Sequence, residues 1–316
     1  AEISVYSGPN VNLVFSGRAE FLGFATRNAN FGAGAFADAD QEVNWGEAIA
    51  HLNLDGTYAV GTEAQLYGGV SVVGSLTRGD GDPAGFTGGE PEDVDLDEAF
   101  LGFNTGTLHS RLLGDYDLDI SAGAQSFHVG DSFIIGDGHF DNFEDGALYL
   151  SPRDAFRETV IVKVNARPVR TDLFYLKGDE DQADAAFAGA NVEYMPGTSG
   201  TFAMLAMLGL DADAAFNPLT PDSRDGLRVI SLRYQGSPFQ TLPDLFLSTE
   251  FTWQWNERNQ RDVEANAWYG EGGYTFSKVP LTPQFSYRYV HFSGDRPGTV
   301  KNEAYDSLFY GYNRGW

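Results

Sequence analysis

The feature that most constrains this 316-residue chain is a strict alternation of polar and apolar residues, repeated in one segment after another. Within residues 43–58, for example, Ala48 and Leu52 share one face, whereas Glu47 and Asn53 share the other. Successive side chains of a β-strand point to opposite faces, so each segment predicts a strand with one apolar and one polar side. The pattern predicts about 13 strands of about ten residues each, and hence an all-β protein.

The connections between these segments alternate between short and long. Short turns are predicted at 60–61, 104–106, 166–168, 196–200, 236–243 and 278–280, and long polar loops at 26–42, 77–93, 128–155, 178–185, 211–224, 256–263 and after 293. Short turns on one rim and long loops on the other are typical of a transmembrane antiparallel β-barrel of the outer membrane. A soluble β-sandwich also alternates polar and apolar residues, but it rarely sustains strands this long with this rhythm.

Composition supports the same class of protein. The chain has 38 Gly, 15 Tyr and 24 Phe, which suits a β-protein rich in turns and aromatic residues. No segment approaches the roughly 18 to 20 consecutive apolar residues of a transmembrane helix, so any membrane span must consist of strands. The absence of cysteine excludes disulfides and thiolate sites and suits export through an oxidising compartment. A net charge of -25 argues against nucleic acid as a partner.

One strand changes into an unusual loop within the segment from Ile120 to Asp141. Polar residues alternate with apolar ones up to about His128, and turn residues then surround a short apolar run. Such a run has to be covered, so we expect this loop to fold back into the mouth of the barrel as a constriction or plug. The residues assigned to the constriction are Asp131, Phe133, Ile134, Ile135 and Asp137.

Several short motifs lie in this segment and at the end of the chain. They are Gly123-Ala124-Gln125, residues 127–131 (FHVGD), residues 135–138 (IGDG), residues 301–306 (KNEAYD), residues 308–311 (LFYG) and residues 314–316 (RGW). The stretch from about Leu96 to the last residue resembles the alginate-export family of outer-membrane β-barrels. Ala124 stands where that family usually has Arg, so the contribution of that cation is not expected here. The resemblance implies a porin-like channel in the bacterial outer membrane, with lipid, lipopolysaccharide and a hydrophilic solute or polysaccharide as partners.

The odd number of predicted strands has its own implication. Bacterial single-chain barrels close with an even number of strands, and the resemblance implies about 18, with further strands after the final motif. We expect residues 1–316 to form a single β-barrel domain that lacks its C-terminal strands.

The polar faces of the strands supply the candidate pore lining. The residues assigned to it are Arg18, Glu20, Glu47, Glu63, Asp117, Asp119, Gln125, Lys163, Glu193, Arg233, Glu250, Glu271 and Arg288. A conduit for a polyuronate would need Arg and Lys along its path, yet acids outnumber bases in this set. Either further strands and folded-in loops supply cations, or this chain does not pass a polyanion. Some of these pairs are equally consistent with cross-strand salt bridges that hold the wall.

The sequence contains no convincing catalytic or metal-binding constellation. The five histidines, His51, His109, His128, His139 and His291, lack partners at the spacing of a metal or nucleophile site, so no enzyme is expected. Acids crowd residues 80–95 and 179–184, where calcium could bind, but the Asp-x-Asp-x-Asp-Gly spacing is missing. We favour a solvated acidic rim and expect no cofactor apart from possible loop calcium.

These observations favour an outer-membrane channel for a saccharide or polysaccharide. A general cation-preferring porin stays open as an alternative, and so does an adhesion or structural barrel of the outer membrane. A lipase or protease barrel would need Ser, His and an acid clustered on one rim, and no such spacing occurs. The identity and charge of the solute, the direction of transport and the oligomeric state stay open.

Overall fold

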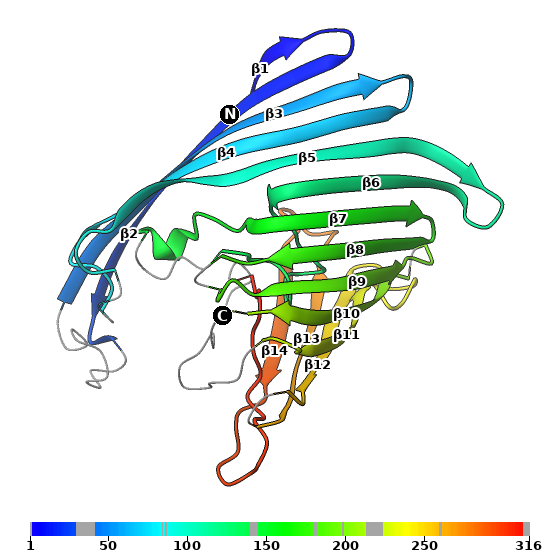
Figure 1. Ribbon diagram of the computed structural model, residues 1–316. Coiled ribbons are helices and arrows are strands. Elements are labelled where there is room, and N and C mark those ends of the chain that lie inside the picture. Colours follow the sequence, from blue (N-terminus) through cyan, green and yellow to red (C-terminus); the bar gives the residue numbers. More distant parts are fainter. Residues whose placement is uncertain are drawn as a thin grey trace.

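The computed structural model describes residues 2–29, 42–83, 85, 87–139, 145–179, 182–197, 199–212, 224–258 and 261–311. They form one 14-stranded sheet in which each strand pairs antiparallel with its sequence neighbours, and the sheet curls around loops on its concave side (Figure 1). The strands are β1 (Glu2–Ser7), β2 (Val11–Arg27), β3 (Glu42–Val60), β4 (Ala64–Gly79), β5 (Glu92–Ser110), β6 (Gly114–Gln125), β7 (Phe156–Ala166), β8 (Val169–Lys177), β9 (Ala186–Tyr194), β10 (Thr201–Asp211), β11 (Arg228–Gly236), β12 (Leu245–Asn256), β13 (Val263–Thr275) and β14 (Gln284–Phe292). The all-β class and the antiparallel barrel topology agree with the prediction.

The number of strands and some of their ends differ from the prediction. The sequence predicted about 13 strands and missed β1, which has only six residues, all exposed, and pairs with β2 alone. The predicted turn at 104–106 is wrong, because β5 continues through an irregularity between Asn104 and Thr107 and ends at Ser110. Residues 92–95, predicted as part of an acidic loop, also belong to β5. No described residues pair β1 with β14, and the expectation of further strands stays a prediction.

The outward face of the sheet is apolar. Large apolar side chains lie exposed at alternate positions of neighbouring strands, as at Leu52 (54% exposed), Val160 (48%) and Leu232 (56%). Aromatic residues share this face near the strand ends, among them Tyr58, Tyr194 and Trp253. Such a surface is unstable in water but suits a lipid environment.

The concave face is divided into two regions of different chemistry. On β7–β13 it carries buried apolar residues, including Ile161, Phe174, Leu205, Met207 and Val229, which pack against loop residues. On β2–β6 it is mainly polar and is covered in part by the segment that contains the 3-10 helix η2 (Leu148–Leu150). No helix among the described residues is long and apolar enough to cross a membrane.

Candidate functional site

Two segments distant in sequence combine into one plug on the concave face. The plug comprises residues 127–138, which follow β6, and residues 307–311, which follow β14. The N–H groups of Gly136 and Asp137 donate to the carbonyl of Phe309 at 2.8 and 3.0 Å. The Phe309 N–H donates back to the carbonyl of Ile134 at 3.2 Å, and Ile135 and Phe309 form a parallel β-bridge. These main-chain bonds make the two segments a single structural unit.

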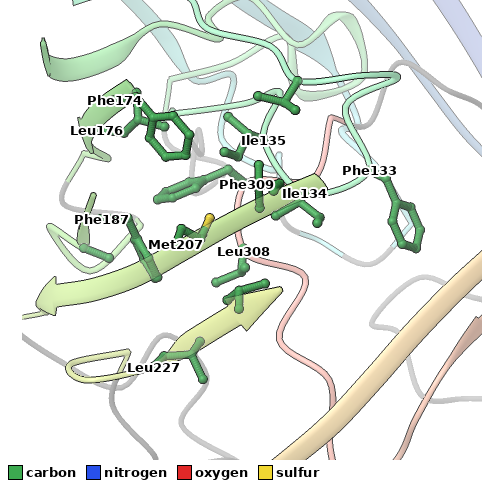
Figure 2. Packing of buried hydrophobic residues seen from close by; sticks show 14 of the residues in the cluster. Phe133, Ile134, Ile135, Phe174, Leu176, Phe187, Met207, Leu227, Leu308 and Phe309 are labelled. Atoms are coloured by element: carbon green, nitrogen blue, oxygen red, sulfur yellow. The ribbon is translucent and has the colours of Figure 1, made fainter. Parts of the chain in front are cut away.

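Apolar packing fixes the plug against the inner wall of β7–β13 (Figure 2). Phe309 contacts Phe156 and Phe187 edge to face, with ring centroids 4.9 and 5.5 Å apart. Phe133 meets Tyr269 in the same way at 5.0 Å. All five rings are essentially buried. The loop predicted as a constriction thus fills part of the interior, while its effect on transport stays a prediction.

Charged groups on the wall hold the plug residues that follow β6. Arg288 of β14 binds Asp131 of the plug and donates from Nε to Glu271 at 3.0 Å. Its guanidinium also lies 4.1 Å from the ring centre of Tyr269. Gly130 has a φ of 62°, and a Cβ at this position would lie 2.4 Å from Nη1 of Arg233, so glycine permits this close approach.

A second ion pair holds the segment that leads into residues 307–311. The side chain of Arg224 is 1% exposed and donates to both carboxylate oxygens of Asp306, at 2.8 and 2.9 Å. Burial alone raises the pKa of Asp306, but the charge and hydrogen bonds of Arg224 outweigh burial and hold it below its ordinary value. The Asp306 carboxylate also accepts the N–H of Leu308 at 2.8 Å, which joins the ion pair directly to the plug.

Six of the 13 predicted pore-lining residues lie beneath the plug or beside it. Glu250 is 2% exposed and accepts a hydrogen bond from Ser231 at 2.6 Å, and Arg233 binds Glu193 at 2.7 Å. Gln125, at the end of β6, donates to Thr159 at 2.6 Å. These groups, with Glu271 and Arg288, are buried or half-buried and paired among the described residues, and their assignment to the pore lining stays a prediction.

The remaining seven predicted residues lie in four other places. Glu47 is buried and accepts the N–H groups of Tyr149 and Leu150 at the η2 turn. Glu63 lies in the turn before β4 rather than in the wall, because β4 begins at Ala64. Asp117, Asp119 and Lys163 lie towards the short-turn end of β6 and β7, where Asp117 accepts from Asn165 at 2.7 Å and Asp119 from Asn104 at 3.1 Å.

Arg18 and Glu20 line a cavity of about 540 Å³ on the concave side of β2–β5. The cavity lining consists of Arg18, Glu20, His51, Asn53, Asp55, Val70, Ser71, Asp97, Glu98, Ser126, Leu150, Ser151, Pro152 and Asp154. A larger cavity, of about 1100 Å³, lies at the short-turn end and is lined in part by Asp117, Asn165 and Arg170. Both cavities open to solvent, unlike the packed region around the plug.

Sequence reasoning missed the carboxylates that characterise the smaller cavity. Asp97 and Glu98 lie at a register shift of β5, and Asp154 follows η2. One signal was present in the sequence: apolar outward residues fall on even numbers at Val94 and Leu96 but on odd numbers from Ala99 onward. This change of parity predicts a bulge at Asp97 and Glu98.

Further titratable groups gather where the plug meets the ends of β7 and β8. Burial raises the pKa of Asp137 to about 8, although the backbone N–H of His139 donates to it at 3.1 Å. His139 Nδ1 lies 2.8 Å from Asp179. Among the described residues, no three His, Asp or Glu side chains are placed to hold a metal ion. Asp141, Glu180 and Asp181 lie outside the described residues, so loop calcium stays a prediction.

A comparison with known families agrees with this geometry. Residues 54–316 match the family described as alginate export, which covers most of the chain. The chain belongs to the alginate-export family. This family member is a β-barrel of the bacterial outer membrane and forms a channel there.

Solved structures similar to this alginate-export family member include three from Pseudomonas aeruginosa and Acinetobacter baumannii. Pseudomonas aeruginosa OccK7 has 10% identity and a TM-score of 0.31 over 90% of this chain and 93% of its own. Pseudomonas aeruginosa OccK5 has 13% identity and a TM-score of 0.32 over 90% and 92%. Acinetobacter baumannii OccAB3 has 10% identity and a TM-score of 0.29 over 93% and 96%. No curated protein matches the chain.

Proposed function

We propose that this channel passes a saccharide, and that the solute moves along the concave side of β2–β6, past the plug. The observation that carries the proposal is the polar cavity of about 540 Å³ beside the plug. Its volume falls within the roughly 300 to 1,000 Å³ that small-molecule sites occupy. Membership of a family described as alginate export supports a sugar-like solute.

The cavity lining has the hydrogen-bonding groups that a carbohydrate requires. Hydroxyl groups of Ser71, Ser126 and Ser151 and the amide of Asn53 can donate to or accept from sugar hydroxyls. Carboxylates such as Glu98 add acceptors. A solute with many hydroxyls can exchange water for these groups without leaving polar atoms unpaired, which suits passage rather than tight retention.

The neighbouring residues Asn53 and Leu54 offer a matched test. Asn53 lines the cavity, whereas Leu54 lies on the outward face and is 47% exposed. Asn53→Trp should narrow the route and slow the entry of neutral oligosaccharides into liposomes that contain the full-length protein, and Leu54→Trp should leave entry unchanged.

Equal entry rates in the two variants would refute this route. Correctly inserted protein with no conductance at all would instead favour the adhesion or structural alternative. We propose no enzymatic role.

A further inference from the structure

Resting on the proposed function, we propose that the open route selects for cationic and neutral solutes and excludes free polyuronate. The groups that set this preference are Asp97, Glu98 and Asp154. The solute class is thus a neutral or positively charged saccharide rather than a polyanion. The proposal stands on the shape of β5, the position of the loop opposite it, and the placement of the interior cations.

A bulge in β5 turns two successive carboxylates into the cavity. The pairing of β4 with β5 shifts between Ser71, which faces Glu98, and Val72, which faces Leu96, and leaves Asp97 as the extra residue. In a regular strand one of the two acids would point to lipid, but here both line the cavity. The Ser71 hydroxyl donates to the carboxylate of Asp97 at 3.4 Å and accepts the backbone N–H of Glu98 at 2.9 Å.

A third carboxylate approaches from the loop opposite. Ser126 donates from its N–H to Glu98 at 3.0 Å and from its hydroxyl to Asp154 at 2.6 Å, so one residue holds both carboxylates in place. Although burial alone raises the pKa of Asp154, hydrogen bonds from His128 and Ser126 hold it below its ordinary value. Asp154 is therefore an anion at neutral pH.

Two atoms that border the cavity indicate unused binding capacity. Oδ1 of Asp97 and Nε2 of His51 are buried and have no hydrogen-bond partner among the described residues. Buried polar atoms without partners are uncommon unless water or a ligand satisfies them. The two atoms thus mark hydrogen-bonding capacity in the cavity wall that the described residues leave unsatisfied.

Four arginines of the described interior are committed elsewhere. Arg224 and Arg288 bind Asp306 and Asp131 at the plug, and Arg233 binds Glu193. Arg153, which is 4% exposed, binds Asp93, Asp95 and Asp145. Each guanidinium is neutralised by at least one carboxylate at close range, and short pairs of this kind project little positive potential into a neighbouring solvated route.

The cavity retains a marked excess of negative charge. Its lining includes five acids (Glu20, Asp55, Asp97, Glu98 and Asp154) and one arginine, Arg18, which already pairs with Glu20 at 2.9 Å. A concave site lined by one sign of charge concentrates counter-ions and repels like charge. Free polyuronate should be excluded for this reason.

Reversal potentials in planar bilayers with a KCl gradient test the proposal on the full-length protein. Wild type should prefer K⁺, and Asp97→Asn combined with Glu98→Gln should move the permeability ratio towards one. Asp211→Asn combined with Glu257→Gln removes two charges from exposed positions outside the cavity lining and should leave the ratio unchanged. A wild-type channel that prefers anions, or equal shifts in both double variants, would overturn the inference.

Thiol probes test the same potential without altering the acids. The chain has no cysteine, so Asn53→Cys introduces a single thiol in the cavity and Leu112→Cys one on an exposed turn. A cationic methanethiosulfonate should modify the Asn53→Cys variant about tenfold faster than an anionic one does, after normalisation to the Leu112→Cys variant. Equal normalised rates would sink the inference but leave the channel intact, whereas absence of any conductance would refute the proposed function itself.

Discussion

Substitution of Asp306 by Asn should release the plug from one of its two ionic anchors. In wild type the Arg224 side chain is 1% exposed and donates to Asp306 at 2.8 and 2.9 Å. It also donates to the side-chain and backbone oxygens of Gln182 at 3.0 and 3.4 Å. Asn keeps the volume of Asp306 and can still accept the N–H of Leu308. The substitution therefore removes the negative charge and leaves the guanidinium in its buried position.

The expected magnitude follows from the burial of the pair. Removing one partner of a buried ion pair typically costs about 3 to 5 kcal/mol, because the other charge stays desolvated. The side chain of Asp306 is 25% exposed, which places this case at the lower end. A loss of about 3 kcal/mol corresponds to a factor of about 100 in the docking equilibrium of residues 307–311.

Hydrogen exchange measures this equilibrium directly. The amides of Gly136 and Asp137 donate to the Phe309 carbonyl, so their protection should fall by about 100-fold in Asp306→Asn. Asp295→Asn alters an exposed pair with Arg261 and should leave protection at these amides unchanged. Unchanged protection in Asp306→Asn would refute the assignment of this pair as an anchor.

Three further predictions concern the lipid face, the plug core and pH. Val160 lies near the middle of β7 on the outward face, so Val160→Arg should cost about 2 to 4 kcal/mol of folding free energy in lipid. Glu158→Arg, near the strand end, should cost little. Folding titrations in liposomes measure both. Ile134→Asp should place a charge in the apolar plug and raise single-channel conductance, while Ile134→Leu should not. The charged groups around Asp137 are His139, Asp154 and Asp179, and burial raises the pKa of Asp137 to about 8. Between its ordinary pKa and this raised value, the docked plug therefore holds a proton that the undocked plug has released. Docking should weaken as pH rises from about 4 to about 8, and protease resistance of the plug should follow that trend in wild type but not in Asp137→Asn.

Alternation along the sequence predicted which way most strands face but left the facing of β8 and β10 unresolved. Where one face is apolar and the other polar, as in β3 with Leu52 and Asn53, the prediction agrees with the exposure of the side chains. In β10, Met204 and Leu208 are exposed outward while Leu205 and Met207 are buried inward. Both faces are apolar, so no alternation exists to read.

The sequence also located the plug loop but not what it covers. Glu250 was assigned to an inward face, and the structure places it inward, yet the plug buries it. Alternation specifies the face of a side chain and carries no information about a loop that packs on that face from about 100 residues away. The same limit hid residues 307–311, whose partner segment precedes them by more than 150 residues.

Alternation breaks down in both halves of the interior, and the cause differs between them. Apolar inward residues such as Leu205 and Phe174 would cost about 25 cal/mol for each Å² left in water, so these strands require a cover, and the plug supplies it. At Asp97 and Glu98 the break has the opposite effect, since it directs two carboxylates inward that would be costly to bury without cations. Along the proposed route, a hydrophilic solute therefore passes the packed region where the plug covers β7–β13 and moves along the acidic half on β2–β6.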